Sequence, residues 1–263
     1  MNTLFFRLRA YLRHWVTCLD RHSLQAPFIY DLYQSTIVSS KSPPLRHEIE
    51  SLRNHLLKNT NSFQVTDYGT GRNSKKKAQL TTVSHITRNS SCSPKEGKFL
   101  WNLCEYFQAR HVLELGTSMG IGSSYMASSS FLPKIYTFEG CPRTAEAAKE
   151  NFKKLNLSNL QVFEGNIDQT LPSFLSQSPK LDLVYLDANH TYEATLRYFL
   201  WLLPHLHKHS VVVFDDIHWS QGMEKAWKKI LRDSPHAISI DLFDLGVLFF
   251  DPAKKKQHYV LRF

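Results

Sequence analysis

The chain has few cysteines and no long apolar run, and each absence argues against a class of protein. Its 263 residues include four cysteines, at 18, 92, 104 and 141, with no Cys-x-x-Cys pair. Neither a disulfide framework nor a zinc site is expected, and a reduced, cytoplasmic setting is favoured. No stretch of about 18 apolar residues occurs, so a transmembrane helix is not expected. Internal repeats and recognisable nucleic-acid motifs are also absent from the sequence.

The formal net charge is +9 at pH 7, which by itself would fit a nucleic-acid or membrane partner. The basic residues are scattered, apart from lysine triplets at 75–77 and 254–256. Both triplets stand beside turn-like sequence, which favours solvated loops. We therefore expect no specific nucleic-acid partner. Hydrophobic residues make up 42% of the chain, enough for a packed core.

A glycine-rich turn organises the sequence at residues 112–124, Val-Leu-Glu-Leu-Gly-Thr-Ser-Met-Gly-Ile-Gly-Ser-Ser. An apolar run, small residues and a helical pattern follow one another, which predicts a buried strand, a tight turn and a helix. Such a turn lets the backbone approach a ligand. Ser118 stands where a dinucleotide fingerprint has its second glycine, so a dehydrogenase is disfavoured. Glu114, two residues before the first glycine, instead suits a ligand that carries an amine.

The residues before this turn, 1–92, are expected to form an N-terminal helical cap and an irregular loop. Apolar and arginine positions three and four apart predict an amphipathic helix over 3–19. A helix packed on the domain is favoured there, with a membrane-surface or transit-peptide helix as the alternative. Further helices are expected from residue 26 and over 44–57.

A polar segment at 59–94 is expected to be a long irregular connection. Within it, Asp67, Gly69 and Gly71 fit either a pocket wall or a surface turn. The segment ends where Ser93, Pro94 and Glu96 have the pattern of a helix capping box.

Strand and helix patterns alternate after the glycine turn. Strands are expected at 134–139, 160–164, 181–187 and 210–216, and helices at 142–155, 170–177, 192–206 and 222–232. This alternation predicts an α/β fold, a Rossmann-like, doubly wound, mostly parallel sheet, in a domain at 93–263. Three last segments without helices between them, 237–243, 246–250 and 258–263, are expected to form an antiparallel meander.

Five successive strands end in acids or amides, namely Glu114, Glu139, the Asn166/Asp168 pair, Asp187 and the Asp215/Asp216 pair. Any single one fits a helix N-cap, but five in succession indicate a ligand site. In parallel sheets, ligands bind beyond the carboxyl ends of the strands. Glu139 is placed to accept hydrogen bonds from two ribose hydroxyls, and Asn166 and Asp168 would lie near an adenine edge.

In the order of its motifs, the sequence resembles the class I S-adenosylmethionine-dependent methyltransferases. Within them it is most similar to the cation-dependent O-methyltransferases, the group of the catechol and caffeoyl-CoA enzymes. The similar segments are 93–100, 112–120, 136–139, 181–188 and 211–216. The first 90 residues instead look like the cap of a poorly characterised bacterial methyltransferase family, which shares Phe-Glu-Gly-Cys-Pro at 138–142 and Phe-Asp-Asp-Ile-His-Trp at 214–219.

The resemblance implies an enzyme that transfers a methyl group from S-adenosylmethionine to a small-molecule acceptor, through a hydroxyl oxygen. It implies cofactor binding by Glu114, Gly116, Thr117, Ser118, Gly120, Glu139, Gly140, Asn166, Ile167, Asp168 and Asp187. It also implies an Mg²⁺-like ion at Asp187, Asp215 and Asp216, since carboxylate oxygens suit a hard cation. The family has Asp-Asn where this chain has Asp215-Asp216.

The family's lysine base corresponds to His190, so His190 and Asp187 are the candidate catalytic residues. The alternative for His190 is a ring that caps the next helix or packs under a lid. His218 is a second candidate, as ligand or base. Two other functions compete: metal-independent N- or C-methyl transfer, and nucleotide binding without catalysis. A homodimer is one expectation for the assembly.

Overall fold

The computed structural model describes residues 3–67 and 77–263. The chain clusters into two compact units, which we call the terminal unit (Met1–Val38 with Lys180–Phe263) and the central unit (Ser39–Pro179). The predicted turn at 68–72 and the lysines at 75 and 76 lie outside the described residues. The predicted domain boundary at residue 92 stays a prediction.

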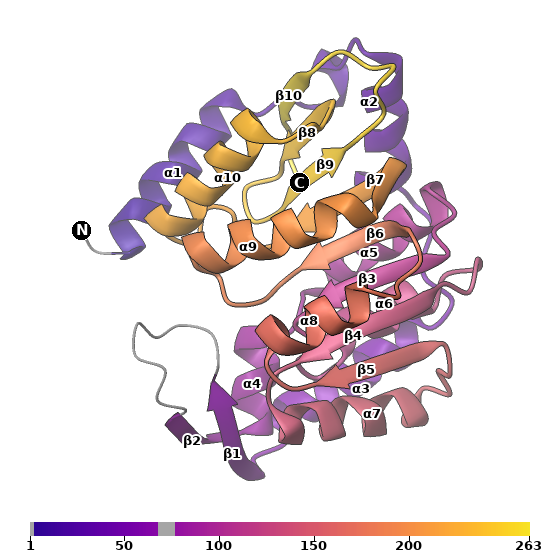
Figure 1. Ribbon diagram of the computed structural model, residues 1–263, viewed down its shortest axis with the longest axis vertical. Coiled ribbons are helices and arrows are strands. Elements are labelled where there is room, and N and C mark those ends of the chain that lie inside the picture. Colours follow the sequence, from indigo (N-terminus) through magenta and orange to yellow (C-terminus); the bar gives the residue numbers. More distant parts are fainter. Residues whose placement is uncertain (1–2, 68–76) are drawn as a thin grey trace. The chain divides into compact units, whose positions relative to one another are not determined.

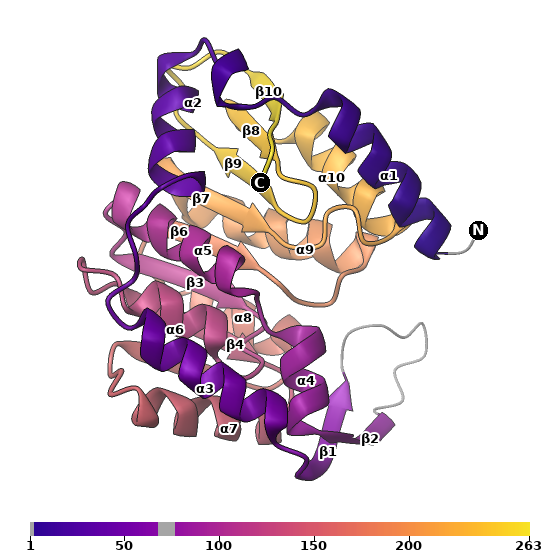
Figure 2. The ribbon, with the colours of Figure 1, turned by 180° about the vertical axis from the view of Figure 1, so that it is seen from behind.

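The central unit is built on three parallel strands (Figure 1): β3 (His111–Leu115), β4 (Lys134–Glu139) and β5 (Leu160–Glu164). Its longer helices are α3 (Arg46–Lys58), α5 (Pro94–Tyr106), α6 (Ile121–Ala127), α7 (Pro142–Lys154) and α8 (Ile167–Leu175). Helices α3, α5 and α6 cover one face of these strands, and α8 covers the other (Figure 2). Because both faces are covered, the strands need near-continuous apolar runs, and Val112, Leu113 and Leu115 are fully buried.

Helix α5 begins with the predicted capping box. The Ser93 hydroxyl accepts a hydrogen bond from the Glu96 N–H, and the Ser93 N–H donates to the Glu96 carboxylate at 2.7 Å. Pro94 occupies the first turn, where its missing N–H leaves no intrahelical bond unmade. The sequence prediction for this helix start is confirmed.

The prediction of an irregular connection over 59–94 is wrong. The segment contains an antiparallel hairpin, β1 (Ser62–Asp67) and β2 (Lys77–Thr82), followed by helix α4 (Val83–Ser90). The Thr82 hydroxyl caps α4 by accepting from the His85 N–H at 3.2 Å. Val83 and Ile86 are buried and join the core that α3 also contributes to. The few apolar residues of this segment therefore fix a helix that its polar composition conceals.

The terminal unit holds strands β6 (Leu181–Leu186), β7 (Leu206–Phe214), β8 (Ile238–Asp241), β9 (Gly246–Phe249) and β10 (Gln257–Val260). Their order is β10-β8-β9-β7-β6, with β6 and β7 parallel and β9 antiparallel to both β7 and β8. Helices α9 (Tyr192–Leu202) and α10 (Gln221–Asp233) pack on one face, where Phe214 contacts the rings of Phe199 and Trp227. The mostly parallel sheet with an antiparallel strand pair is confirmed.

The expected meander is wrong in its last strand. Strand β9 has β7 on one edge and β8 on the other, so its two edges are already paired. Strand β10 reverses direction after β9 and pairs with the free edge of β8, to which it is parallel. An adjacent antiparallel pairing of β9 and β10 would need an edge that β9 no longer offers.

The N-terminal helices of the terminal unit are α1 (Thr3–Thr17) and α2 (Pro27–Leu32). Short 3-10 helices span Arg21–Ser23 and Leu203–His205, and one π-helical turn spans Tyr33–Ile37. The Leu19 N–H donates to the Val260 carbonyl at 2.8 Å, and the Tyr33 hydroxyl donates to the Arg262 carbonyl at 3.1 Å. The segments that follow the two helices therefore bond to the C-terminal end of the chain. The N-terminal cap stays a prediction. No helix in the described ranges is long and apolar enough to cross a membrane.

Candidate functional site

The glycine-rich turn of the central unit joins β3 to α6 in a backbone conformation that glycine favours. Gly116, Ser118 and Gly120 have positive φ angles of 97°, 49° and 77°. The Gly116 N–H donates to the Phe138 carbonyl at 2.9 Å, which ties the turn to the end of β4. A Cβ on Gly120 would lie 2.5 Å from the Phe152 ring, so this position requires glycine.

Ser118 carries a buried polar atom without a partner. Its Oγ has no hydrogen-bond partner among the residues that the structure describes. A buried hydroxyl without a hydrogen bond is costly, and a bound ligand is one way to satisfy it. The Ser118 N–H, in contrast, donates to the Glu139 carboxylate at 2.9 Å.

Glu139 ends β4, and backbone N–H groups hold both of its oxygens. One oxygen accepts from Ser118 and the other from Cys141, each at 2.9 Å. The side chain is half-buried, and half-buried Gly140 follows it in the turn. Each carboxylate oxygen has a further lone pair, so the fixed group can accept hydrogen bonds from a ligand diol.

Glu114 is almost fully buried and bonds to hydroxyls of its own unit. One carboxylate oxygen accepts from the Thr137 hydroxyl at 2.5 Å and from the Ser123 hydroxyl. The Thr137 hydroxyl lies 2.6 Å from that of Thr117. Glu114 therefore anchors the start of α6 to β4. Its contact with a ligand amine stays a prediction.

The predicted adenine-side residues lie between β5 and α8. Asn166 caps α8 by accepting from the Asp168 N–H at 3.0 Å. Ile167 is buried, whereas Asp168 is exposed. The Gly165 N–H donates to the Glu139 carbonyl at 2.9 Å, which places this turn beside the end of β4. These residues thus extend one polar edge of the central unit.

A second cluster lies in the terminal unit, after β6 and β7, and its centre is His190. The ring Nε2 lies 3.2 Å from the Asp187 carboxylate, and Nδ1 lies 3.7 Å from that of Asp216. The Tyr185 hydroxyl donates to the Asp215 carboxylate at 3.0 Å and lies 3.4 Å from that of Asp187. The structure therefore brings together all four residues predicted for catalysis and metal binding.

The electrostatics of this cluster favour a charged imidazole. Burial lowers the pKa of His190, but the hydrogen bond and charge of Asp187, together with the charge of Asp216, outweigh it and raise the pKa above its ordinary value. Burial raises the pKa of the Asp216 carboxyl, while His190 opposes that change. Two carboxylates thus stabilise the proton on the His190 ring.

In the described arrangement, other side chains contact the predicted metal ligands. No group of three or more His, Cys, Asp or Glu side chains within residues 3–67 and 77–263 is arranged to hold one. The carboxylates of Asp187 and Asp216 face the two ring nitrogens of His190, and Asp215 accepts from Tyr185 and from the Asp216 N–H at 2.8 Å. Imidazole nitrogens thus lie against oxygens that the predicted ion would need. The magnesium site stays a prediction.

His218 belongs to a different environment within the same unit. Its ring is 5% exposed, and Nε2 lies 2.8 Å from the Asp241 carboxylate. It stacks on Phe243 at a centroid distance of 5.5 Å, and His14 of α1 also contacts Asp241. These contacts describe a buried pair that joins α1 to the end of β8. A role as ligand or base stays a prediction.

Sequence reasoning missed Tyr185, which contacts two of the candidate acids. It stands two residues before Asp187, and side chains two apart lie on the same face of a strand. This periodicity of two could have indicated that Tyr185 lies on the same side as Asp187. The Tyr185 hydroxyl donates to the carboxylate of Asp215, whereas the ring nitrogens of His190 face Asp187 and Asp216.

Comparison with known proteins supports this description of the chain. Residues 113–217 match the family model described as a methyltransferase domain. The matched segment includes the glycine turn, Glu139 and the Asp187 cluster.

Two curated relatives resemble about half of the chain. The catechol O-methyltransferase of Niastella koreensis is 32% identical over 132 residues, which are 48% of this chain and 58% of that protein. The catechol O-methyltransferase of Mycobacterium tuberculosis is 32% identical over 127 residues, 48% and 56% of the two chains. The matched part thus spans little more than half the length of these relatives.

A solved structure shares the fold. The O-methyltransferase from Bacillus cereus, determined in complex with SAH, has a TM-score of 0.57 and 18% identity, over 84% of this chain and 97% of that chain. The likeness confirms the Rossmann-like, doubly wound, mostly parallel fold predicted from the alternating strands and helices.

Proposed function

We propose that this protein is an S-adenosylmethionine-dependent methyltransferase that methylates a hydroxyl oxygen of a small molecule. The observation that carries the proposal is the carboxylate of Glu139, whose two oxygens are fixed by backbone N–H groups next to the glycine turn. A rigid acceptor pair of this kind suits the two adjacent hydroxyls of a ribose. The domain match and the fold of SAH-bound O-methyltransferases support the same cofactor.

The central unit fits this cofactor through its own residues. Glu139 would hold the ribose, the unsatisfied Ser118 hydroxyl and the backbone of Gly116, Thr117 and Gly120 would hold the methionine part, and Asn166 to Asp168 would border the adenine. The absence of a Cβ at Gly120 keeps the turn open without displacing Phe152. When bound, the sulfonium supplies an activated methyl group.

The terminal unit supplies the proton chemistry. In the proposed reaction, the acceptor oxygen would form a bond to the methyl carbon while the carbon–sulfur bond breaks. The electron pair of the broken bond would stay on the sulfur, which becomes a neutral thioether. The hydroxyl proton goes to the neutral form of His190, which is the form present above its raised pKa. Asp187 and Asp216 hold the ring and stabilise the resulting imidazolium, as the raised pKa of His190 indicates.

The acceptor class is proposed from the relatives, which are named as catechol O-methyltransferases. A magnesium ion at Asp187, Asp215 and Asp216 would orient two neighbouring hydroxyls, and it remains a prediction of the resemblance. No step of the proposed reaction depends on that ion. A cytoplasmic location, suggested by four cysteines that form no disulfide among the described residues, and a homodimer are further proposals.

Calorimetric titration with S-adenosylmethionine tests the proposal, once with magnesium and once with a chelator. We expect binding in both conditions, followed by SAH release when catechol-type acceptors are added. A folded protein, shown by circular dichroism, that binds neither S-adenosylmethionine nor SAH would contradict the proposal. Turnover that stops with chelator and returns with magnesium would instead assign the ion to the aspartate cluster.

A further inference from the structure

Helix α1 presents an apolar side to solvent. At 3.6 residues per turn, one arc of the helix carries large apolar side chains that are all more than half exposed. These are Phe5, Leu8, Leu12, Trp15 and Val16. The opposite side, with Phe6, Ala10 and His14, is buried against the terminal unit. A helix that merely capped the domain would need only the second side.

Arginines border the exposed apolar arc on both sides. Arg9 and Arg13 follow one border on the helical wheel, and Arg7, which pairs with Asp244 at 2.8 Å, follows the other. The helix contains no Asp or Glu. Arg7 also lies over the ring of Trp219, at 4.9 Å from the centroid, and this tryptophan is 44% exposed. The arrangement is that of an interfacial helix, with aromatic and aliphatic side chains between cationic borders.

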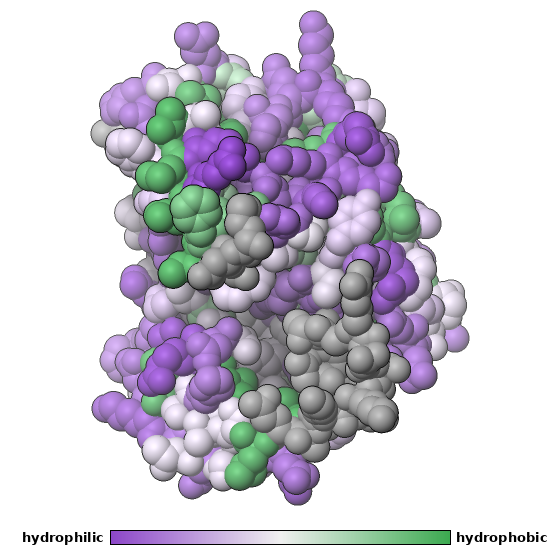
Figure 3. Space-filling view, turned by 90° about the vertical axis from the view of Figure 1, so that its left-hand side faces the viewer, coloured by the Kyte–Doolittle hydropathy of each residue, from purple (hydrophilic) through white to green (hydrophobic). Residues whose placement is uncertain are grey.

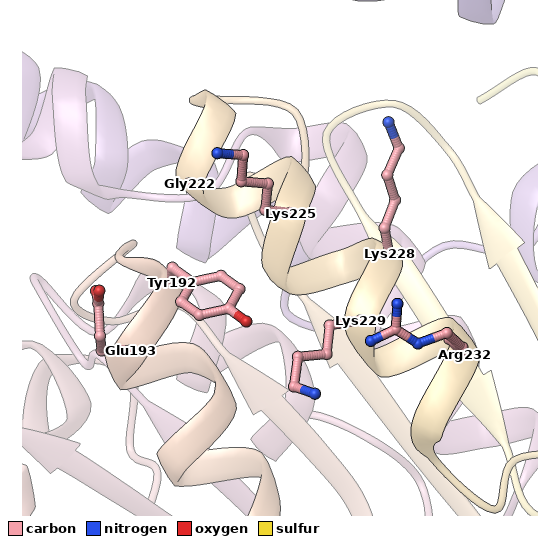
Figure 4. Close-up of a pocket in the computed structure, with 7 residues that line it drawn as sticks. All are labelled: Tyr192, Glu193, Gly222, Lys225, Lys228, Lys229 and Arg232. Atoms are coloured by element: carbon pink, nitrogen blue, oxygen red, sulfur yellow. The ribbon is translucent and has the colours of Figure 1, made fainter.

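Helix α10 continues the positive surface beside α1. Glu224 of α10 forms ion pairs with Arg13 of α1 and with Lys228, the latter at 2.8 Å, so the two cations flank one carboxylate. Further along α10, its cations line a cleft of about 610 Å³ against Tyr192 of α9 (Figure 4), and they are Lys225, Lys228, Lys229 and Arg232. Figure 3 shows a hydrophobic band on the upper left of this face of the molecule, beside strongly hydrophilic residues.

From these observations we propose that α1 docks the protein on the surface of an anionic lipid bilayer. The apolar arc enters the boundary between headgroups and acyl chains, and the arginines with the α10 lysines contact the acidic headgroups. A second copy is a poorer occupant. A two-fold contact through α1 would bring the cationic borders of two copies together, and Asp244 and Glu224 already pair with Arg7 and Arg13. An anionic membrane compensates both cationic borders at once.

Vesicle co-sedimentation of the full-length chain tests this proposal. The vesicles contain equal parts of phosphatidylcholine and phosphatidylglycerol, in about 0.15 M salt, and pure phosphatidylcholine serves as the neutral comparison. We expect binding to the anionic vesicles and weaker binding to the neutral ones. Leu12→Ser should weaken partitioning at least about fivefold, because it removes inserted carbon atoms. Arg9→Gln should weaken it about fivefold.

Matched controls distinguish insertion from general stickiness. Leu200, on α9 of the same unit, is as exposed as Leu12, and Leu200→Ser should leave partitioning unchanged. Arg88→Gln, at an exposed position of α4, is the charge control. Equal effects of Leu12→Ser and Leu200→Ser, or binding lost entirely at that salt concentration, would overturn the proposal. So would a dimer, seen by light scattering, that Leu12→Ser dissociates.

Discussion

Two acidic side chains, Glu139 and Asp187, stand at the ends of parallel strands in the two units, and they are held in different ways. Glu139, in the central unit, accepts hydrogen bonds from the backbone N–H groups of Ser118 and Cys141. Asp187, in the terminal unit, instead contacts the side chains of His190 and Tyr185. Backbone donors never change protonation, whereas an imidazole does. The first arrangement therefore suits fixed recognition of a ligand, and the second suits movement of a proton.

Replacing His190 tests the second half of this comparison and should give the largest effect. His190→Gln retains a side chain of similar reach but loses the base, so turnover should fall by about 100-fold or more. S-adenosylmethionine affinity, measured by calorimetry, should stay unchanged. The matched control is His207→Gln, because His207 also pairs with an aspartate, Asp182, at 2.9 Å. Equal losses in both variants would remove the special role of His190.

Replacing Glu139 tests the first half. Glu139→Gln removes the charge and puts an amide donor where an oxygen accepts from backbone N–H. The dissociation constant for S-adenosylmethionine should therefore rise at least about tenfold, which corresponds to the free energy of one hydrogen bond to a charged group. Glu164 faces Glu139 across β4 and β5 but pairs with Lys149 at the surface. Glu164→Gln should bind normally, and a similar loss there would point to a general charge effect.

A smaller effect is expected from the backbone that positions the Glu139 partners. Gly120→Ala would force a Cβ toward the Phe152 ring at a positive φ, and it should lower the free energy of unfolding by about 1–3 kcal/mol. Gly222 has an ordinary φ, and a Cβ there would make ordinary van der Waals contacts, the nearest at 3.6 Å to the Ser220 hydroxyl, so Gly222→Ala should stay within about 0.5 kcal/mol of the wild type. Urea unfolding of both variants measures the difference. Equal stabilities would contradict a constrained turn.

The sequence predicted the parts of this fold that local pattern controls. Apolar runs, the glycine turn and the Ser93 capping box fixed β3, α6 and α5, because each depends on neighbours in the chain. The pairing of β10 with β8 was not predictable in this way, because it depends on which strand edges remain free. Helix α4 was missed because only Val83, Ile86 and Thr87 face the core.

The candidate site divides along the same line. The positions of Glu139 and Asp187 after strands were visible in the sequence, since parallel strands carry their ligands at that end. Their partners were not, because those partners depend on side-chain direction. Only the folded structure shows that Glu139 bonds to backbone N–H groups, and that the His190 ring lies between Asp187 and Asp216. The solvent-facing apolar side of α1 likewise required knowing which side of the helix is buried.

The most direct test of the comparison measures affinity and turnover together for Glu139→Gln and His190→Gln, with a catechol acceptor. We predict that saturating S-adenosylmethionine restores turnover in Glu139→Gln, since that variant is impaired in binding. The same saturation should leave His190→Gln inactive although it binds the cofactor normally. The opposite pattern, with normal affinity in Glu139→Gln and restored turnover in His190→Gln, would contradict the division of roles proposed for the two acids.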